Sequence, residues 1–227
     1  MRWVITGTNR GIGLELARQL ASRGDIVDAA VRDPAGAGDL RAVAERVEGR
    51  LRIHACDVGD DASVRAFAAS LPEGSIEALV NNAGVMGKMQ SLEDLDLDDV
   101  RRTFDVDALG PIRVTRALLP RLQRGAKVLH ITSGMGSIGD NQSGGAYGYR
   151  MAKAALNMAS RSMSIDLRGR GILSMVANPG WVQTDMGGAG APLPVETSAK
   201  NLIALVDGML PEQSGSFLDH TGREWPW

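Results

Sequence analysis

The chain has 227 residues, of which 44% are hydrophobic and 23% charged, and its formal net charge is −2. This composition suits one globular domain with a large core, and its nearly balanced charge gives no indication of a nucleic acid or a membrane as partner. The one cysteine, Cys56, has no partner for an internal disulfide, and the chain opens on a strand-like run rather than a signal segment. We therefore expect a reducing, cytoplasmic location.

Seven short runs rich in β-branched and aliphatic residues predict strands at 2–6, 26–31, 50–55, 77–81, 126–132, 171–179 and 215–220. Stretches with helical periodicity alternate with them, and the best formed are 12–23, 63–70, 97–123, 149–168 and 195–210. Such alternation is typical of an α/β protein. It predicts a single domain built on a doubly wound parallel sheet of seven strands with helices on both faces.

In this fold class, ligands bind beyond the carboxyl ends of the strands. The rule points to the segments that follow the strands, at 7–13, 32–38, 57–60, 81–90, 133–147 and 179–194. The last segment is rich in glycine and proline. Its portion 185–194 is either a plain surface connection or a mobile lid over a site, and its length and position favour the lid.

The first of these segments contains TGTNRGIG at 6–13 and leads from a strand into an amphipathic helix. Its glycines would let the backbone turn tightly against a pyrophosphate, whose charge the N-terminus of the helix would stabilise. Glycine is also common in ordinary strand-to-helix turns, and the spacing differs from the general G-x-G-x-x-G fingerprint. Alone, this motif is weak evidence.

Five motifs occur together in the chain: TGTNRGIG (6–13), CDV (56–58), NNAG (81–84), YRMAK (149–153) and NPGWVQT (178–184). In this order and spacing the sequence resembles the classical short-chain dehydrogenase/reductase family. The stretch HITSGMGSIGDNQSGGAYGYRMAKAALN and the ending GSFLDHTGREWPW resemble the branch of small carbonyl reductases that includes C-factor and sniffer. The resemblance covers nearly the whole chain and implies a Rossmann-type domain.

The resemblance also implies which residues bind a dinucleotide. Three glycines would form the phosphate turn, 57–58 would hold the adenine, 81–84 would line the ribose with Asn82 pinning the central strand, and 179–184 would face the nicotinamide. The implied cofactor-binding residues are Gly7, Asn9, Arg10, Gly11, Ile12, Gly13, Arg32, Asp57, Val58, Asn81, Ala83, Gly84, Tyr149, Lys153, Pro179, Gly180, Val182 and Thr184. Taken singly, these positions have ordinary explanations, since Asp57 could cap the next helix and the asparagines could close a turn. One bound dinucleotide would explain them all.

Two arginines favour NADP(H) over NAD(H). Val31 stands at the end of the second strand, where NAD-binding relatives have an aspartate for the ribose 2′-hydroxyl, and Arg32 follows it. Arg10 occupies the other position where NADP-binding relatives carry a base. Two guanidiniums could bind one 2′-phosphate through charge-assisted hydrogen bonds. The alternative for Arg32 is a solvated surface charge.

The chain has two tyrosines, Tyr147 and Tyr149, just ahead of Lys153. Residues four apart share one face of a helix, so only Tyr149 would neighbour the lysine. A free phenol titrates at about pH 10, and a nearby ammonium favours the phenolate. In the family pattern Y-x-x-x-K the tyrosine exchanges the proton and the lysine also binds the nicotinamide ribose. Tyr147 would then line the substrate pocket or pack.

Ser133 follows the fifth strand and could hydrogen-bond the substrate oxygen as negative charge develops. Ser137 is a rival in the same loop, but the family serine stands at the strand end. His130 lies inside the apolar strand, so we interpret it as a packed or partly exposed strand residue and not as a catalytic base. The chain has neither a G-x-S-x-G elbow nor metal-ligand spacing, so we expect no hydrolase triad and no metal.

Asp107 is a departure from the family, because DALGP at 107–111 stands where relatives have N-x-x-G-P. The family asparagine helps to hold a water that links the lysine to solvent. Aspartate is nearly isosteric but charged, so it would stabilise the Lys153 ammonium and offset part of the field that the phenol feels. Alternatively, Asp107 is solvated or pairs with Arg113.

These features predict hydride transfer from NADPH to a small-molecule ketone, aldehyde or quinone, with Ser133, Tyr149, Lys153 and Asp107 as the catalytic residues. The alternative is an NADP(H)-binding redox-sensing or signalling protein with little turnover. The predicted helices 97–123 and 149–168 correspond to those through which the family commonly pairs subunits, so we expect a homodimer or homotetramer. Five side chains suggest an apolar substrate pocket: Met86, Met89, Tyr147, Trp181 and Met186.

Overall fold

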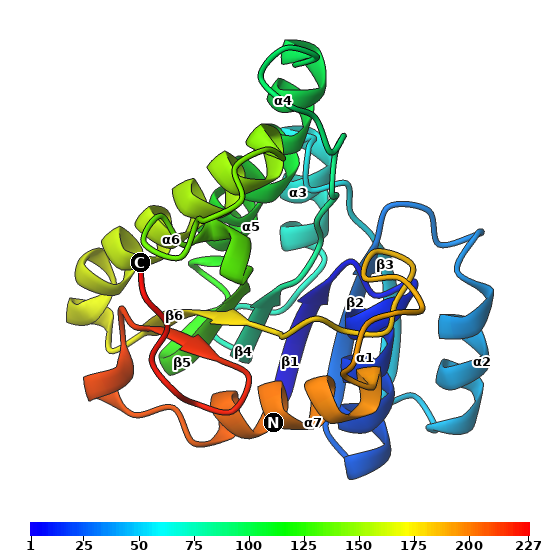
Figure 1. Cartoon of the computed structure of the whole chain (residues 1–227). Helices are drawn as coiled ribbons and strands as arrows, with labels where there is room; N and C mark the ends of the chain where they lie inside the picture. Colours follow the sequence, from blue (N-terminus) through cyan, green and yellow to red (C-terminus); the bar gives the residue numbers. More distant parts are fainter.

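A computed structural model of the chain describes residues 1–227 and contains one sheet of seven strands, all paired in parallel (Figure 1). The strands are β1 (Arg2–Thr6), β2 (Ile26–Val31), β3 (Leu51–Ala55), β4 (Ile76–Asn81), β5 (Leu122–Ile131), β6 (Leu173–Asn178) and β7 (Phe217–Asp219). They lie in the order β3-β2-β1-β4-β5-β6-β7. The chain runs outward from β1 to β3 and then returns to β4, so the order reverses between β1 and β4, the point at which ligands bind in this fold class. The predicted doubly wound sheet is confirmed.

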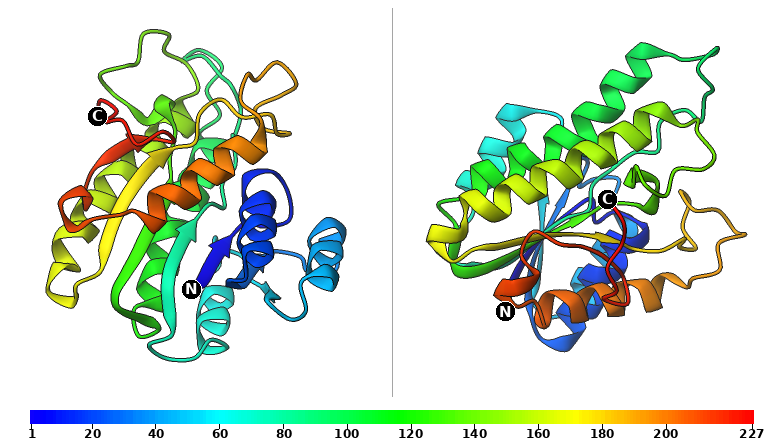
Figure 2. Two further views of the ribbon diagram at one scale, coloured as in Figure 1. Left: turned by 90° about the horizontal axis from the view of Figure 1, so that it is seen from below. Right: turned by 60° about the vertical axis from the view of Figure 1, so that its left-hand side comes forward.

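Helices cover both faces of the sheet (Figure 2). They are α1 (Gly11–Arg23), α2 (Gly38–Arg46), α3 (Asp61–Ala69), α4 (Leu97–Phe104), α5 (Gly110–Leu118), α6 (Tyr147–Asp166) and α7 (Val195–Asp207). The first, second and last of these share one face, where α1 contacts both α2 and α7, and the others lie on the opposite face. None of the helices has the combined length and apolarity that a bilayer crossing requires.

Each face of the sheet has its own apolar core. Alternate side chains of a strand point to opposite faces, so in β1 Trp3 and Ile5 enter the core under α1 and α7, while Val4 enters the core under α3 and α5. All three are wholly buried. Burial on both faces explains why the central strands are continuous apolar runs rather than alternating ones.

The predicted helix 97–123 is wrong in its extent. The structure divides it into α4, a π-helical turn at Asp105–Leu109 and α5, and β5 begins at Leu122, four residues before the predicted start at 126. The apolar pattern misled the prediction because Leu118 at the end of α5 and Leu122 at the start of β5 pack into the same core. The sequence pattern continues across the junction, although the backbone changes from helix to strand.

Two helices begin two residues earlier than predicted. The third helix begins at Asp61 rather than 63, because the Asp60 carboxylate accepts the Ser63 N–H at 2.6 Å and caps it. The sixth begins at Tyr147 rather than 149 and follows Ala146, whose backbone is left-handed with φ 48°. This conformation is costly for a residue with a Cβ. It is supported here by a hydrogen bond from the Ala146 N–H to the Gln90 carbonyl at 3.0 Å.

Candidate active site

The turn from β1 into α1 is built by glycines at the carboxyl end of β1. Gly7 and Gly11 have positive φ angles of 70° and 56°, which glycine adopts without strain. A Cβ on Gly13 would overlap the Gly7 carbonyl oxygen and lie 2.5 Å from Asn82 Nδ2. The turn therefore packs directly against the loop after β4, and no side chain separates them.

Asn82 joins these two segments. Its Nδ2 donates hydrogen bonds to the carbonyls of Thr6 at 2.9 Å and Gly7 at 3.0 Å. The backbone of Ala83 lies against Gly7 from the same side. The prediction that Asn82 pins the central strand is confirmed, and 81–84 and the glycine turn are in direct contact.

The N-terminus of α1 suits a phosphate group. Arg10 is its N-cap, with an extended backbone and no side-chain capping hydrogen bond, and the first turn contains no acidic residue. Asn9 is exposed and Ile12 is half-buried beside it. The free N–H groups and the positive end of the helix dipole would favour an anion here. The turn thus fits the pyrophosphate of a dinucleotide.

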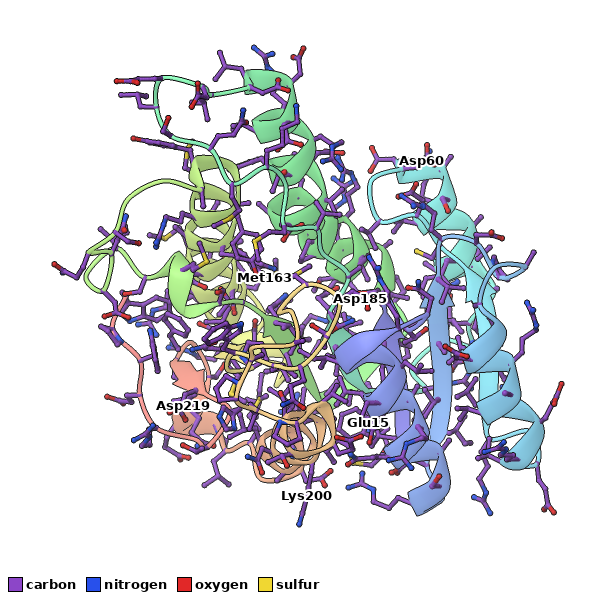
Figure 3. All side chains as sticks on the ribbon, turned by 45° about the vertical axis from the view of Figure 1, so that its right-hand side comes forward. Glu15, Asp60, Met163, Asp185, Lys200 and Asp219 are labelled. Carbon is purple, nitrogen blue, oxygen red and sulfur yellow. The ribbon has the colours of Figure 1, made fainter.

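Arg10 and Arg32 both lie on the surface near this turn. Arg10 pairs with Asp185 at 2.9 Å, and both side chains are largely exposed (Figure 3 labels Asp185). Such a pair contributes little stability, so a phosphate could replace the carboxylate. Arg32 makes no side-chain hydrogen bond or ion pair, which leaves its guanidinium free for a ligand.

In the segment after β3, Asp57 does not cap the helix that follows. Asp57 Oδ1 accepts the N–H of Gly59 at 2.9 Å, and the cap of α3 is Asp60, so the interpretation of Asp57 as a helix cap is wrong. Val58 is buried against Gly110. The neighbouring Cys56 is also buried, and burial together with the Asp57 charge raises the pKa of its thiol to about 12.

Asn81 does not present its side chain to the predicted ribose site. Its Nδ2 donates to Thr115 Oγ1 and to His130 Nδ1, both at 3.1 Å, so only its main chain faces the predicted ribose site. His130 is wholly buried, and its Nε2 lies 3.3 Å from Ser174 Oγ. Burial and the charge of Lys153 lower the pKa of His130 to about 3. The ring is therefore neutral. It is packed inside the sheet rather than partly exposed, which was one of the two environments that the sequence allowed.

Tyr149 and Lys153 lie together on the buried face of α6. They are 7% and 4% exposed, and the Lys153 Nζ lies 5.5 Å from the centre of the Tyr149 ring. Tyr147 points elsewhere and lines a hollow of about 360 Å³ with Met135, Met151 and others of the 135–154 stretch. The prediction from helical spacing that Tyr149 neighbours Lys153 is confirmed, and Lys153 is not among the residues that line the hollow with Tyr147.

Lys153 has two fixed partners. Its Nζ donates a hydrogen bond to the Ile131 carbonyl at 3.1 Å and forms an ion pair with Asp107 Oδ2, also at 3.1 Å. Burial acts to lower the pKa of this ammonium, but the charges of Asp107 and Tyr149 outweigh burial, and the pKa is raised. Lys153 is therefore a charged group in a buried position.

Asp107 is wholly buried in the π-helical turn. Its second oxygen, Oδ1, accepts the Val85 N–H at 2.8 Å, and a Cβ on Gly84 would meet its Oδ2 at 3.0 Å. The alternative that Asp107 is solvated or pairs with Arg113 is wrong, because Arg113 pairs with Asp105 and Asp61. The carboxylate instead connects the loop after β4 to Lys153.

Ser133 stands at the end of β5 and is half-buried. Its Oγ accepts only the Met135 N–H, at 3.1 Å, so its own proton has no partner. Ser137 is 2% exposed, and its Oγ contacts the Asp140 N–H at 3.0 Å and the Trp227 carbonyl at 3.3 Å. Of the two serines, Ser133 has the free hydroxyl.

Sequence reasoning missed Asn157. This side chain accepts the Thr132 hydroxyl at 2.6 Å and donates to the Gly136 carbonyl at 3.3 Å, so it holds the backbone on both sides of Ser133. The available signal was its position four residues after Lys153, which places it on the same helical face.

The segment after β6 returns to the glycine turn. Gly180 has φ 86°, and its N–H donates to Asn178 Oδ1 at 3.2 Å. The side chain of Thr184 lies close to Gly11, where an added Cβ would be 3.3 Å from it. Val182 is buried and forms a single β-bridge with Leu193. Pro179 is held through its carbonyl, which accepts the Ser198 hydroxyl at 2.8 Å. The ends of the 185–194 loop are therefore fixed, and its role as a lid stays a prediction.

Comparison with known proteins agrees with this geometry. The sequence profile described as "short chain dehydrogenase" matches residues 2–191. The chain belongs to this family of oxidoreductases. It is 53% identical over 166 residues, which are 72% of this chain and 100% of the relative, to the protein named "C-signal" of Myxococcus xanthus.

Among solved structures, the carbonyl reductase Sniffer of D. melanogaster superposes with a TM-score of 0.95 at 29% identity, covering 100% of this chain and 99% of the other. An NADPH-bound carbonyl reductase from chicken fatty liver superposes with a TM-score of 0.94 at 32% identity, covering 100% and 98%. The predicted family and branch are confirmed.

The first prediction concerns the glycine turn. Gly13→Ala places a methyl group on the Gly7 carbonyl and on Asn82, so the turn must shift, and the free energy of unfolding should fall by about 1–3 kcal/mol. Urea unfolding followed by circular dichroism measures this. Gly169→Ala is the matched control, because its added Cβ meets no atom within 4 Å. Equal stability of the two variants would contradict the packing described.

Proposed function

We propose that the protein is an NADP(H)-dependent carbonyl reductase. The observation that carries the proposal is the pair of Tyr149 and Lys153 on one buried helix face. Lys153 binds the Ile131 carbonyl at the end of β5, two residues before Ser133, whose hydroxyl proton has no partner. The reversal of strand order between β1 and β4, next to the uncapped N-terminus of α1, supports a dinucleotide as cofactor. The NADPH-bound carbonyl reductase among the structural neighbours supports the choice of cofactor and of substrate class.

When bound, NADPH supplies the hydride to the carbonyl carbon. The substrate oxygen accepts hydrogen bonds from Ser133 and Tyr149, which stabilise the negative charge that develops there. Tyr149 then gives its proton to that oxygen, so that the ketone, aldehyde or quinone leaves as an alcohol or hydroquinone. Lys153, kept charged by Asp107, stabilises the phenolate that remains until solvent returns a proton.

A second candidate function is a binding protein that senses or signals redox state with little turnover. The name of the relative from Myxococcus xanthus, "C-signal", favours keeping it. The test that separates the two functions is a steady-state screen of NADPH oxidation against ketones, aldehydes and quinones. Turnover that depends on Tyr149 supports the reductase, whereas tight NADPH binding without any turnover supports the sensor.

The second prediction concerns the two tyrosines. Tyr149→Phe should lower kcat by at least about a hundredfold, because it removes the general acid. Tyr147→Phe is the matched control and should retain kcat, since Tyr147 lines a hollow that includes neither Tyr149 nor Lys153. Steady-state kinetics with the best carbonyl of the screen measures both, and equal losses would overturn the assignment.

The third prediction concerns the cofactor. If Arg10 and Arg32 bind a 2′-phosphate, charge-assisted bonds of roughly 1.5–3 kcal/mol each give a preference for NADPH over NADH of about tenfold or more. Fluorescence titration of both cofactors measures it. The double variant Arg10→Ala/Arg32→Ala should lose the preference, while Arg101→Ala, an exposed arginine on α4, should keep it. Tighter binding of NADH by the unaltered protein would refute the proposal.

The fourth prediction concerns Asp107. In Asp107→Asn the carboxylate charge no longer outweighs the burial of Lys153, so the pKa of Lys153 should fall and the alkaline limb of the pH–rate profile should move to lower pH. Activity above neutral pH should then fall. Asp105→Asn is the control in the same turn, because Asp105 pairs with Arg113 instead. An unchanged profile for Asp107→Asn would show that the ion pair does not keep the lysine charged.

The fifth prediction concerns assembly. The outer face of α6 carries an exposed apolar stripe, Met151, Met158 and Ile165, with exposed fractions between 50% and 68%. We propose that this stripe contributes to a homodimer or homotetramer. Light scattering should give at least twice the 24.1 kDa of one chain, and Met158→Glu should reduce it, unlike Lys200→Glu on α7 (Figure 3). A mass near that of one chain for the unaltered protein would count against assembly.

A further inference from the structure

Residues 221–227, here called the closing segment, fold back along the edge of the sheet after β7. The nearly buried carboxylate of Asp219 (labelled in Figure 3) holds the turn by accepting hydrogen bonds from Thr221 and from Arg223 Nε at 2.9 Å. The N–H of Trp225 then donates to the Phe217 carbonyl at 2.8 Å. The closing segment is therefore fixed to β7 rather than free.

From this position the closing segment reaches the loop that carries Ser133. In both views of Figure 2 the end of the chain lies beside the loop after β5. The indole of Trp225 packs on Gly134, the residue after Ser133: a Cβ on this glycine would lie 3.2 Å from Trp225 Cζ2. The Trp227 carbonyl accepts the Gly139 N–H at 2.8 Å. Both ends of the 134–139 stretch thus contact the closing segment.

The same loop is held on its other side by α6. Asn157 bonds Thr132 and Gly136, as described above. The backbone around Ser133 is therefore fixed between the helix and the closing segment, while the Ser133 side chain itself has only the Met135 N–H as partner. The position of its Oγ depends on the position of this backbone, because nothing else orients it.

We propose that Trp225, together with the main-chain oxygen of Trp227, positions Ser133 for the oxygen of the carbonyl substrate. Both are positioning residues, since they act through the loop and not on the substrate. The indole acts through its shape, because its Nε1 is buried without a hydrogen-bond partner. Replacing it with another aromatic ring therefore costs no hydrogen bond. The inference rests on the proposed reductase function, in which Ser133 contacts the substrate.

The kinetic test is a double-mutant cycle. Trp225→Ala should lower kcat by about tenfold through misplacement of Ser133, with the Kd for NADPH unchanged. Trp225→Phe should keep at least about half of kcat, because it retains a ring against Gly134. Glu224→Gln, at an exposed position of the same hairpin, is the control and should leave kcat unchanged.

The cycle is closed in the Ser133→Ala background. If Trp225 acts through Ser133, Trp225→Ala should cause no further loss there, because residues that act as one unit are not additive. Additive losses would show that Trp225 affects turnover independently of Ser133, and they would overturn the proposal. Should Trp225→Ala fail to fold, Gly134→Ala presses on the same contact from the loop side and should give the same kinetic signature.

A second readout does not depend on activity. Amide hydrogen exchange of 134–139 should accelerate in Trp225→Ala, while exchange in the turn between β1 and α1 stays unchanged. Unchanged exchange of 134–139 would overturn the positioning role even in an active enzyme. Absence of turnover by the unaltered protein, with accelerated exchange in the variant, would refute the reductase function and leave the contact between the closing segment and the loop established.

Discussion

The buried ion pair between Lys153 and Asp107 is the interaction on which the rest of the site depends. An ammonium that is 4% exposed needs a counter-charge, and Asp107, wholly buried, needs the ammonium and the Val85 N–H in turn. The π-helical turn at Asp105–Leu109 carries the aspartate, and α6 carries the lysine. The pair therefore fixes the loop after β4, the π-helical turn and the buried face of α6 relative to one another. Removing either partner alone would leave an unpaired charge in a low-dielectric site.

The fold was predictable because its signals are local. Apolar strands that are buried on both faces read as continuous runs, and glycine and aspartate mark the ends of several helices. The glycine turn and the spacing of Tyr149 and Lys153 followed from the same kind of signal, since four residues make about one helical turn. The failure at 97–123 has a physical cause as well: Leu118 and Leu122 share a core, so their pattern does not report the change from helix to strand.

The site was less predictable wherever contacts join distant segments. The ion-pair partner of Asp107 could not be predicted from the neighbouring sequence, because Lys153 lies 46 positions away along the chain whereas Arg113 is only six away. The direction of the Asn81 side chain was set by His130, and the backbone support of Ser133 by Asn157 and Trp225. These are contacts of side chains across the sheet or between loops, which no local pattern encodes.

Cys56, the one thiol of the chain, is protected from electrophiles by its burial. Quinones and unsaturated aldehydes are electrophiles that modify thiolates, and an enzyme that turns them over meets them at each cycle. The chain has one thiol; it is buried and its pKa is raised to about 12, so at neutral pH it is neither ionised nor accessible. In the proposed function, a reactive carbonyl beside Tyr149 would therefore meet no thiolate of this chain, which would limit inactivation of the enzyme by its substrates.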